Sequence, residues 1–596
     1  MLRCNYTVKY FSFQPSDGAF TLLETLEVGM KNSFEAPKHG HLELTGHDDE
    51  MAIMFNSASS RTPALRTQRL KPHEEHKRVV HDLQGRRHVS RASEYYQPTA
   101  LPRPGLHAHG HDAKLQPDEV YYYQYGNGVD GWSQIQSFRS KPKTGASQIA
   151  NFIAYADMGV DGALAAQSTT TRVFENVAGG GYDSFLLHFG DISYARGEGS
   201  VWDKFFHHIE PYATRIPYMV SIGNHEYDYT SGGERDPSGA AGPSGQGFHA
   251  AWEQLWLRLG ECSVPMHHRW HVPATGNSIY WYSFNYAGVH VVQISTEHNW
   301  TRRSEQFAWL KRDLESVDRS LTPLVVLTAH RMMYSTQLGL ERDRTVARHS
   351  RSEVEDLLFE NRVNLMLVGH QHAYERSCPV YKGECVSDER APVRIVVCSA
   401  GFELATADFS PAIGNWCVRH ANEFGYLRVS VAANAMQLQF VLNRNGAVYN
   451  ELAIQSWFDA GVRLDAVSDS AHLWYKESPA TKPLSAVSAF NKASVSIALA
   501  FSALATGSRS WYSMAEYTVS RSLSVFETMS ARSTSTASTG LCRHLEHGQL
   551  AERQRRLERR EVVVRDALVL ERDAAMVEGE ARELGEYVYL SCGMVS

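Results

Sequence analysis

Six runs of apolar, β-forming residues between residues 148 and 372 constrain the fold of this chain more than any other feature. Continuous apolar runs of this length are typical of strands buried on both faces. Amphipathic stretches separate the runs. The segment 304–320 has apolar residues at helical spacing, and Ser352 followed by Glu355 predicts a capping box that starts a helix over 352–361. The alternation predicts an α/β domain built of αββα layers.

Five of these runs end in side chains that commonly bind metals. They are Asp157, Asp191, Asn224 with His225, His330, and His370 with His372. Ligands of open α/β sheets bind beyond the carboxyl ends of the strands, so we expect these side chains to converge. A single histidine at a strand end is more often an ordinary core or surface residue, but that reading does not explain five such endings in order. Glycines accompany four of the turns: Gly159, Gly190, Gly223 and Gly369.

The chemistry of these donors points to two metal ions. The set offers oxygen and nitrogen without a thiolate, which excludes thiolate-rich zinc and iron–sulfur sites and suits hard or borderline cations. Seven candidate donors, one of them a shared carboxylate, are enough for two metals with places left for water and substrate. Metal pairs ~3.5–4 Å apart hold a phosphate during in-line attack and generate hydroxide near neutral pH. The pattern therefore predicts a phosphoester hydrolase.

The order of the motifs resembles that of the metallophosphoesterase superfamily, and specifically of its purple acid phosphatases. The family pattern is DxG, GDxxY, GNH(D/E), VxxH and GHxH. Its counterparts here are residues 157–159, 190–194, 223–226, 327–330 and 369–372. The connecting segments resemble the large plant-type branch over residues 38–455. The resemblance implies a metallophosphoesterase domain preceded by an all-β, fibronectin-III-like sandwich.

The resemblance also implies a role for each side chain. The donors divide between two metals: Asp157, Tyr194 and His372 on the first, Asn224, His330 and His370 on the second, and Asp191 on both. The first metal is expected to be Fe(III) and the second a divalent Zn, Mn or Fe. His225 should contact the phosphate or protonate the leaving group. The implied reaction is hydrolysis of a small phosphomonoester at acidic pH, by in-line attack of a metal-bound hydroxide.

Tyr194 compensates for a missing ligand. Many metallophosphoesterases have a histidine on the first metal where this chain has Gly159. Phenolate is a hard, anionic donor that favours Fe(III) over softer divalent ions. Free tyrosine has a pKa near ~10, and a trivalent cation lowers it enough to ionise the phenol. The protein is therefore expected to be coloured, and Tyr194→Phe is expected to bleach it.

One departure from the family bears on substrate range. Some plant relatives carry two substrate-facing histidines about ten residues after the fourth motif, and this chain has none there. The candidates for the replacement charge are Arg331, Arg342, Arg344 and His349. Two other functions stay open: a nucleotide pyrophosphatase or phosphodiesterase using the same site, and a non-catalytic interaction protein. The branch contains members described as inactive, but all seven ligand types are intact here.

The predicted organisation has four parts. Residues 1–37 show no clear pattern, 38–145 form the fibronectin-III-like domain, and 146–456 form the catalytic domain with its C-terminal part. Residues 457–596 are rich in Ser and Ala and then form a charged, helix-like segment. A non-native extension or a disordered tail explains that last part as well as any function does.

Composition limits the partners and the compartment. A net charge of −7 and a pI of about 6.5 give no argument for nucleic acid or an anionic membrane. Cys378 and Cys385 flank a short loop and could form a local disulfide, which suits an oxidising compartment; two free cytosolic thiols are the alternative. Asn5 and Asn299 match the N-glycosylation pattern. The resemblance implies a secreted or vacuolar/endomembrane protein and leaves a homodimer open, although residues 1–18 lack a signal peptide's apolar region.

Overall fold

The computed structural model describes residues 5–14, 19–28, 36–57, 64–69, 80–81, 106–196, 198–227, 237–239, 263–388, 390–432, 435–456, 576–577 and 586–593. The chain forms two compact units. One consists of residues 1–34 together with 480–596, and the other of residues 35–479. Among the described residues, no helix is both long and apolar enough to cross a membrane.

The smaller unit contains a sheet in the order β2-β1-β26-β25. Its strands are β1 (Asn5–Gln14), β2 (Ala19–Val28), β25 (Met576–Val577) and β26 (Glu586–Gly593). No pattern was predicted for residues 1–37, and the structure differs because β1 pairs antiparallel with β26 from the other end of the sequence. The helix predicted for the charged segment 550–585 is wrong at Met576–Val577, which form the strand β25, and the rest of that segment lies outside the described residues.

Two sheets pack face to face at the start of the larger unit. One has the order β3-β4-β7 and the other β10-β8-β5-β6, with β9 beside β8. The strands are β3 (Lys38–Leu44), β4 (Glu50–Ser57), β5 (Ala64–Arg69), β6 (Val80–His81), β7 (Leu106–Ala113), β8 (Val120–Asn127), β9 (Gly131–Trp132) and β10 (Gln136–Arg139). Phe55 packs on Tyr125 at 4.9 Å between the sheets. The predicted all-β sandwich is confirmed.

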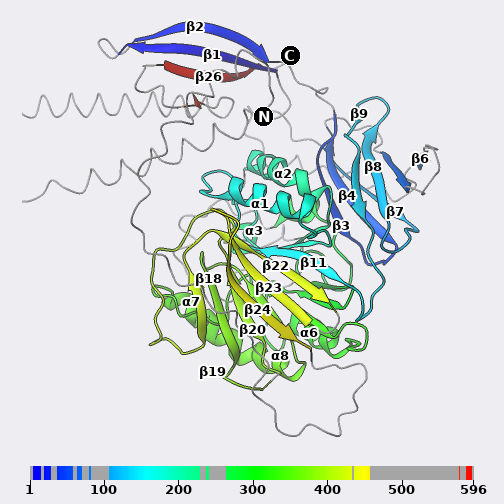
Figure 1. The fold of residues 1–596 in the computed structure, drawn as a ribbon, viewed down its shortest axis with the longest axis vertical. Helices are drawn as coiled ribbons and strands as arrows, with labels where there is room; N and C mark the ends of the chain where they lie inside the picture. The colour runs from blue at the N-terminus through cyan, green and yellow to red at the C-terminus, as the bar shows by residue number, and fades with distance from the viewer. Residues whose placement is uncertain are drawn as a thin grey trace, which may run out of the picture. The chain divides into compact units, whose positions relative to one another are not determined.

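The remainder of this unit is built on two larger sheets (Figure 1). The six-stranded sheet has the order β13-β12-β11-β22-β23-β24, and the eight-stranded sheet the order β14-β15-β16-β17-β20-β18-β19 with β21 beside β18. The first contains β11 (Ala150–Tyr155), β12 (Leu186–Phe189), β13 (Tyr218–Ser221), β22 (Gly425–Ala432), β23 (Ala435–Leu442) and β24 (Val448–Gln455). The second contains β14 (Tyr282–Tyr286), β15 (Val289–Gln293), β16 (Leu324–Ala329), β17 (Leu365–Val368), β18 (Tyr374–Tyr381), β19 (Glu384–Cys385), β20 (Val393–Val397) and β21 (Cys417–Ala421).

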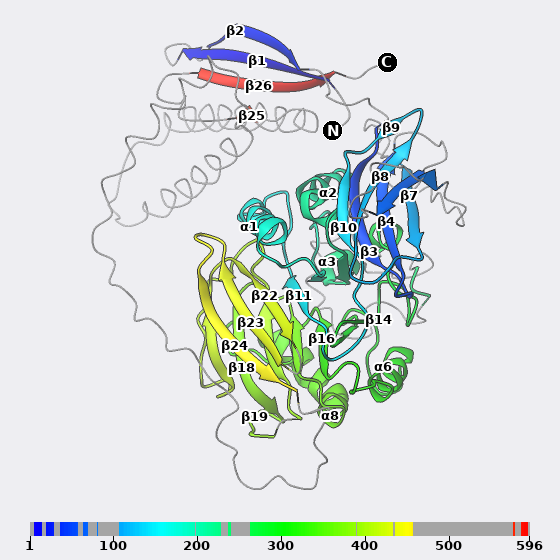
Figure 2. The same ribbon diagram turned by 45° about the vertical axis from the view of Figure 1, so that its right-hand side comes forward.

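Helices lie on the outer sides of both sheets and leave part of the outer face of β23 and β24 exposed (Figure 2). The helices are α1 (Ala166–Gly179), α2 (Gly199–Ala213), α3 (Asn224–Tyr227), α5 (Val264–Arg269), α6 (Glu305–Glu315), α7 (Glu341–Ser350), the π-helical turn η3 (Arg351–Glu355) and α8 (Asp356–Glu360). Helix α2 packs on β11, where Tyr212 and Tyr155 share a hydrogen bond of 3.1 Å. Helix α6 packs on β15, where Asp313 meets His290 at 2.9 Å. The predicted αββα layers are confirmed.

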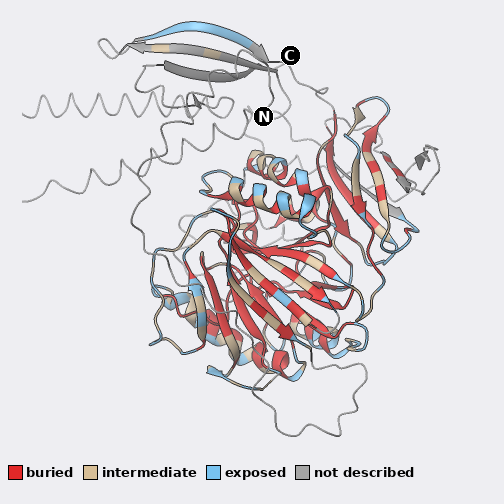
Figure 3. Cartoon of the chain, in the orientation of Figure 1, coloured by how far each residue is buried: buried red, intermediate tan, exposed pale blue. Residues whose placement is uncertain are grey.

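Buried residues are concentrated in the strands of the two large sheets (Figure 3). Residues of β12, β13, β15, β16 and β17 are buried throughout. Tyr374 of β18 stacks on Phe440 of β23 at 4.0 Å, which joins the two sheets. Burial on both faces explains why these strands read as continuous apolar runs in the sequence.

Two local predictions have different outcomes. The disulfide between Cys378 and Cys385 is present. The capping box at Ser352 is wrong, because the helix begins at Glu341 and continues through this position. Ser352 donates its hydroxyl back to the His349 carbonyl, a bond that helix interiors allow. The domain limits proposed from the sequence remain predictions.

Candidate metal centre

Strand ends from both large sheets bring the predicted donors together. Asp157 and Asp191 follow β11 and β12 by two residues, and Asn224 begins α3 just after β13. His330 directly follows β16, and His370 follows β17 by two residues. Strands β11, β12 and β13 are parallel neighbours, and so are β16 and β17. Their carboxyl ends therefore form one edge, as the spacing predicts.

The first donor group consists of Asp157, Tyr194 and His372. The Tyr194 hydroxyl donates to Asp157 Oδ1 at 2.8 Å and lies 3.0 Å from His372 Nε2. His372 Nε2 is 3.3 Å from the same Asp157 oxygen. Asp157 and Tyr194 are buried, so the three donor atoms face one another in a shielded place.

The second donor group consists of Asn224, His330 and His370. Asn224 Oδ1 lies 2.9 Å from His330 Nε2 and 2.8 Å from His370 Nδ1. Asp191 Oδ2 lies 3.3 Å from His330 Nε2, and the charge of Asp191 also acts on both Tyr194 and His372. Asp191 is thus placed to serve both groups.

His225 stands beside the two groups. Its backbone N–H donates to Asp191 Oδ1 at 2.8 Å, and its Nε2 lies 3.9 Å from Asp191 Oδ2. Its ring packs 4.3 Å from that of Tyr194. Burial lowers the pKa of His225, and the charge of Asp191 only partly restores it. The structure therefore gathers all eight predicted side chains, while their individual roles remain predictions.

The proton pattern of the second group fits a cation. His330 Nδ1 lies 3.2 Å from the carbonyl of Phe189 and donates to it, which leaves a lone pair on Nε2. That lone pair faces the oxygens of Asn224 and Asp191, which are also acceptors. Acceptors that converge in this way are satisfied by a metal ion or by an extra proton.

The electrostatics of the centre also favour positive charge. Burial alone would lower the pKa of His330, but Asp191 outweighs it and raises this pKa to about 9. Burial likewise opposes protonation of His372, yet hydrogen bonds to Asp157 and Glu403 raise its pKa to about 10. A metal binding here has to displace these protons, so its affinity falls at low pH.

Tyr194 is likewise held in its protonated form. Burial, and then the Asp157 carboxylate, raise the pKa of its phenol well above the ordinary value. A bound cation would lower this pKa and favour the phenolate.

The backbone at these strand ends is strained. Asp157, Asp191, Tyr194 and His370 have φ of 60°, 50°, 54° and 68°, a region that side-chain-bearing residues rarely adopt. Strained positions of this kind cluster at functional sites. Gly223 is required for close approach, because a Cβ there would lie 2.3 Å from Asp191 Oδ1.

Glu226 fixes the loop that carries Asp191. Its buried carboxylate accepts the backbone N–H groups of Asp191, Ile192 and Gly223 at 2.8, 2.7 and 3.1 Å. Glu226 had no predicted role, although it is the last residue of the GNHE motif. Its position in that motif was the available signal.

Phe402 and His225 enclose the ring of Tyr194. The Phe402 ring stacks on Tyr194 at 3.6 Å, on planes 3° apart. A Cβ on Gly159 would lie 2.9 Å from Phe402 and 3.2 Å from Tyr194. The space beside Gly159 is therefore filled by these rings, which supports the predicted exchange of a histidine ligand for Tyr194.

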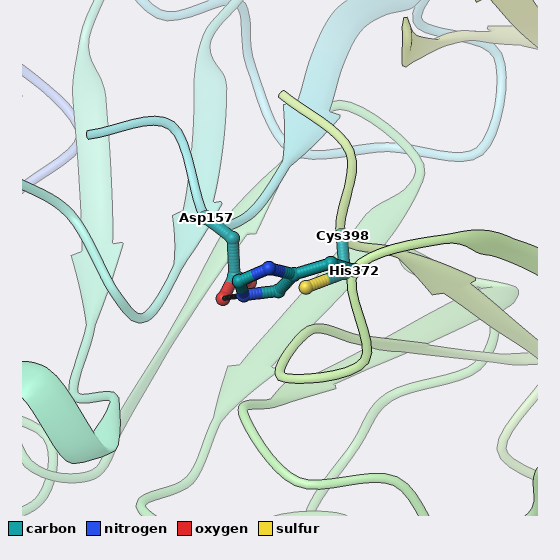
Figure 4. A group of neighbouring side chains, drawn as sticks. All are labelled: Asp157, His372 and Cys398. Atoms are coloured by element: carbon teal, nitrogen blue, oxygen red, sulfur yellow. Dashed lines mark ion pairs between the residues drawn. The ribbon is translucent and has the colours of Figure 1, made fainter. Parts of the chain in front are cut away.

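A thiol that was not among the predicted ligands adjoins the first group. Donor atoms of Asp157, His372 and Cys398 all lie within 4.8 Å of one another (Figure 4). Burial, and then Asp157, raise the pKa of the Cys398 thiol well above its usual value, so it stays protonated beside that carboxylate. Cys398 directly follows β20, so the strand-end rule that found the other donors would have found it too.

The predicted substrate-facing cations are mostly engaged elsewhere. Arg331 is buried and donates from Nε and Nη2 to the Glu297 carboxylate at 2.9–3.2 Å. On α7, Arg344 pairs with Glu341, His349 packs on Trp300, and Arg342 is exposed.

Arg196 is an exposed cation at the rim of the centre, and the sequence analysis missed it. Its guanidinium carbon lies 5.6 Å from the centroid of the Phe402 ring, and its charge lowers the pKa of His225 and of Glu403. It lies two residues after Tyr194 in the GDISYAR stretch, which was the available signal.

Comparisons with known families agree with this geometry. Residues 151–374 match the model of calcineurin-like phosphoesterases, residues 37–140 the purple acid phosphatase N-terminal domain, and residues 391–451 the iron/zinc purple acid phosphatase-like C-terminal model. The fold and the strand-end donors define a metallophosphoesterase. Taken with the N-terminal and C-terminal matches, they show that the chain belongs to the purple acid phosphatases.

Some of the similar proteins are named as inactive phosphatases and others are not. "Probable inactive purple acid phosphatase 9" of Arabidopsis thaliana is 29% identical, over 86% of this chain and 85% of its own length. Purple acid phosphatase 22 of the same plant is 29% identical over 60% of this chain and 72% of its own. The structure of purple acid phosphatase PPD1 from yellow lupin seeds has a TM-score of 0.62 at 25% identity, covering 76% of this chain and 80% of that one.

Coverage of other relatives is lower. This chain spans 56% of the length of three further Arabidopsis relatives whose names also contain "inactive". Family membership therefore leaves activity to be argued from the site itself.

Proposed function

We propose that this protein is an active acid phosphatase that hydrolyses small phosphomonoesters with Fe(III) and a divalent Zn, Mn or Fe. The observation that carries the proposal is the convergence of two donor groups on either side of Asp191. The Asp157–Tyr194–His372 group offers two oxygen donors that become anionic, and the Asn224 group offers neutral donors. Hard anionic oxygens suit a trivalent ion, and a nitrogen-rich neutral set suits a divalent one.

When bound, the metal pair would supply positive charge to clamp the phosphate and would activate a water. The protein's own residues do the rest. Asp191 holds the two groups together, Glu226 holds the loop of Asp191, and the ring stack fixes Tyr194. His225 is partly exposed beside both groups and can donate a proton to a leaving oxygen; the negative charge of a bound phosphate would raise its pKa for that task. Arg196 supplies positive charge to the outer phosphate oxygens.

The direct test is to produce the full chain, determine its metals, and assay an aryl phosphate across pH. About one iron and one divalent ion per chain, visible colour and activity strongest at acidic pH are expected. A chain that binds no iron, or that acts only above neutrality, contradicts the proposal. Loss of both metals with retained activity would contradict it as well.

A second activity is supported by one relative. The nucleotide pyrophosphatase/phosphodiesterase of Hordeum vulgare is 27% identical to this chain. The matched region covers 88% of the barley protein and 54% of this chain. The exposed Arg196 could hold a second phosphate. Rates on an aryl phosphate, an aryl phosphodiester and a nucleoside diphosphate measured side by side decide between the two. A diester or diphosphate rate above the monoester rate favours the second activity.

We also infer an oxidising compartment, that of a secreted or endomembrane protein. The Cys378–Cys385 disulfide supports this inference, and Asn299 of the acceptor pattern is exposed. Glycosidase treatment of the protein from its native cells should shift its mobility. Replacing Asn299 by Gln should remove one part of that shift.

A further inference from the structure

The outer nitrogen of His370 faces a charged network that the predicted roles do not include. Asp343 Oδ1 lies 3.1 Å from His370 Nε2. Arg331 Nη1 lies 3.5 Å from the same Asp343 oxygen and 3.2 Å from His370 Nε2. Arg331 is already held by Glu297, whose side chain is fully buried. Asp343 is thus the carboxylate of this network that meets His370.

This contact decides which nitrogen of His370 carries the proton. An Asp343 carboxylate only accepts, so His370 donates its Nε2 proton to it. The lone pair then lies on Nδ1, the atom that is 2.8 Å from Asn224 Oδ1. The Arg331 guanidinium can only donate hydrogen bonds. If Arg331 donated to His370 Nε2, the His370 proton would have to lie on Nδ1 and would point at the second donor group.

We propose that Asp343 is a positioning residue for the second metal: it fixes the His370 tautomer and ring so that Nδ1 is free to bind. The proposal rests on the proposed function, because it assumes that a second metal binds at Asn224, His330 and His370. Carboxylates that accept the outer proton of a ligating histidine orient the ring and increase its basicity, and losing them lowers metal affinity ~10–100-fold.

Asp343 comes from the first turn of α7, shortly after the stretch in which the histidines of some plant relatives are absent. It would give the second metal a negative neighbour. An acid in a first helical turn also stabilises the helix through its dipole. A test has to separate that role from an effect on His370.

The test compares second-metal affinity in the full chain and in two variants of this residue, Asp343→Ala and Asp343→Asn. Each protein is loaded with iron, and Zn²⁺ or Mn²⁺ binding is measured by competition with a chelator. We expect Asp343→Ala to bind the second metal ~10–100-fold more weakly, since Arg331 is then the polar neighbour left at Nε2. Asp343→Asn keeps an acceptor oxygen and should lose less. Iron content and the visible spectrum should stay unchanged in both.

Two control variants remove the competing explanations. Glu341→Ala deletes an exposed acid from the same helical turn without touching a donor residue. Asp313→Ala deletes the partner of His290, a buried Asp–His pair of 2.9 Å at the far end of β15. Both should keep wild-type affinity for the second metal.

The outcomes are distinct. Affinity of Asp343→Ala within about twofold of wild type, or an equal loss in either control, overturns the role of Asp343 and leaves the proposed function standing. A wild-type chain that takes up iron but no second metal overturns both.

Discussion

The two halves of the candidate metal centre are built on different principles. The first half uses a carboxylate and a phenol, and the phenol ring lies against other rings: Phe402 stacks on Tyr194 at 3.6 Å, and the His225 ring lies 4.3 Å away. The second half uses an amide and two imidazoles, and its support is ionic, through Asp343, Arg331 and Glu297.

The difference teaches how one fold can hold two unlike cations. Negative donors in a buried, ring-lined place favour a hard trivalent ion that exchanges slowly. Neutral donors, one of them beside a partly exposed carboxylate, would favour a divalent ion. Variants that affect one half or both can test this contrast.

The largest effect is expected from the residue common to both halves. Asp191→Ala should remove or weaken both metals and reduce kcat/KM by more than ~100-fold, because even supporting residues around a metal cost 10–100-fold. Metal analysis and the aryl phosphate assay measure this. Asp161→Ala, which removes an exposed partner of Lys204, is the matched control. Loss of only one metal would show that Asp191 belongs to one half.

His225 belongs to neither half, so its replacement should separate binding from chemistry. His225→Asn should lower kcat ~10²–10⁴-fold if it transfers a proton, with metal content unchanged. The loss should be smaller for a substrate whose leaving group needs no proton. An equal loss for good and poor leaving groups would assign His225 to phosphate binding.

A pair of variants should separate the two halves. Tyr194→Phe should abolish the visible absorption, because the proposed colour would come from charge transfer between the phenolate and Fe(III). Asn224→Ala should keep the colour while the divalent metal is lost. Spectra and metal analysis of both proteins decide it. Colour that survives in Tyr194→Phe would show that another donor, such as the adjoining thiol, holds the iron.

The pH dependence of the free energy of unfolding tests how strongly burial acts on His188, which lies near Asp157 and Asp191. Burial lowers the pKa of His188 from 6.5 to about 3. The unfolded chain therefore binds more protons than the folded one below pH 6.5. This stabilising contribution is complete above that pH and is lost as the pH falls towards 3.

Urea unfolding of the metal-free protein at about pH 7 and about pH 5 should show wild type losing about 2 kcal/mol more than His188→Asn, at ~1.4 kcal/mol per pH unit below 6.5. Asn retains a group for the hydrogen bond that His188 Nδ1 makes with Tyr218 at 2.7 Å. Equal pH dependence of the two proteins would mean that His188 does not titrate this way.

The smallest effect is expected at the thiol. Cys398→Ser should leave iron content and spectrum unchanged and change the free energy of unfolding by about 1 kcal/mol, the usual size for one altered hydrogen bond. A shifted absorption maximum would instead show that the sulfur binds the iron. The two halves would then differ less in their donor atoms.

Much of this centre could be predicted from the sequence because strand ends carry it. Asp157, Asp191 and His330 each follow a buried apolar run, and the carboxyl ends of parallel strands meet at one edge whatever the loops do. The αββα layers followed from the same runs. The local pattern of apolar residues was sufficient to predict these strands because each of them is apolar on both faces.

The misses have a different physical origin. Asp343 and Phe402 lie in segments without a strand pattern, and only tertiary packing brings them to the centre. The pairing of β1 with β26 joins residues more than 570 positions apart, as Asn5 meets Gly593. The capping box failed because Ser352 lies inside a helix whose start had no strong signal, with Leu340 as its first flanking residue.

Both donor groups draw on both large sheets. Asp157 follows β11 of the six-stranded sheet while His372 follows β17 of the eight-stranded one, and the second group likewise joins Asn224 to His330. Each metal would therefore act as a cross-link between two layers separated by up to 215 residues of chain, which is the interval from Asp157 to His372. Stripping the metals should loosen the seam between the layers first, so hydrogen exchange should rise in β11, β16 and β17 at their carboxyl ends before it rises in the outer helices.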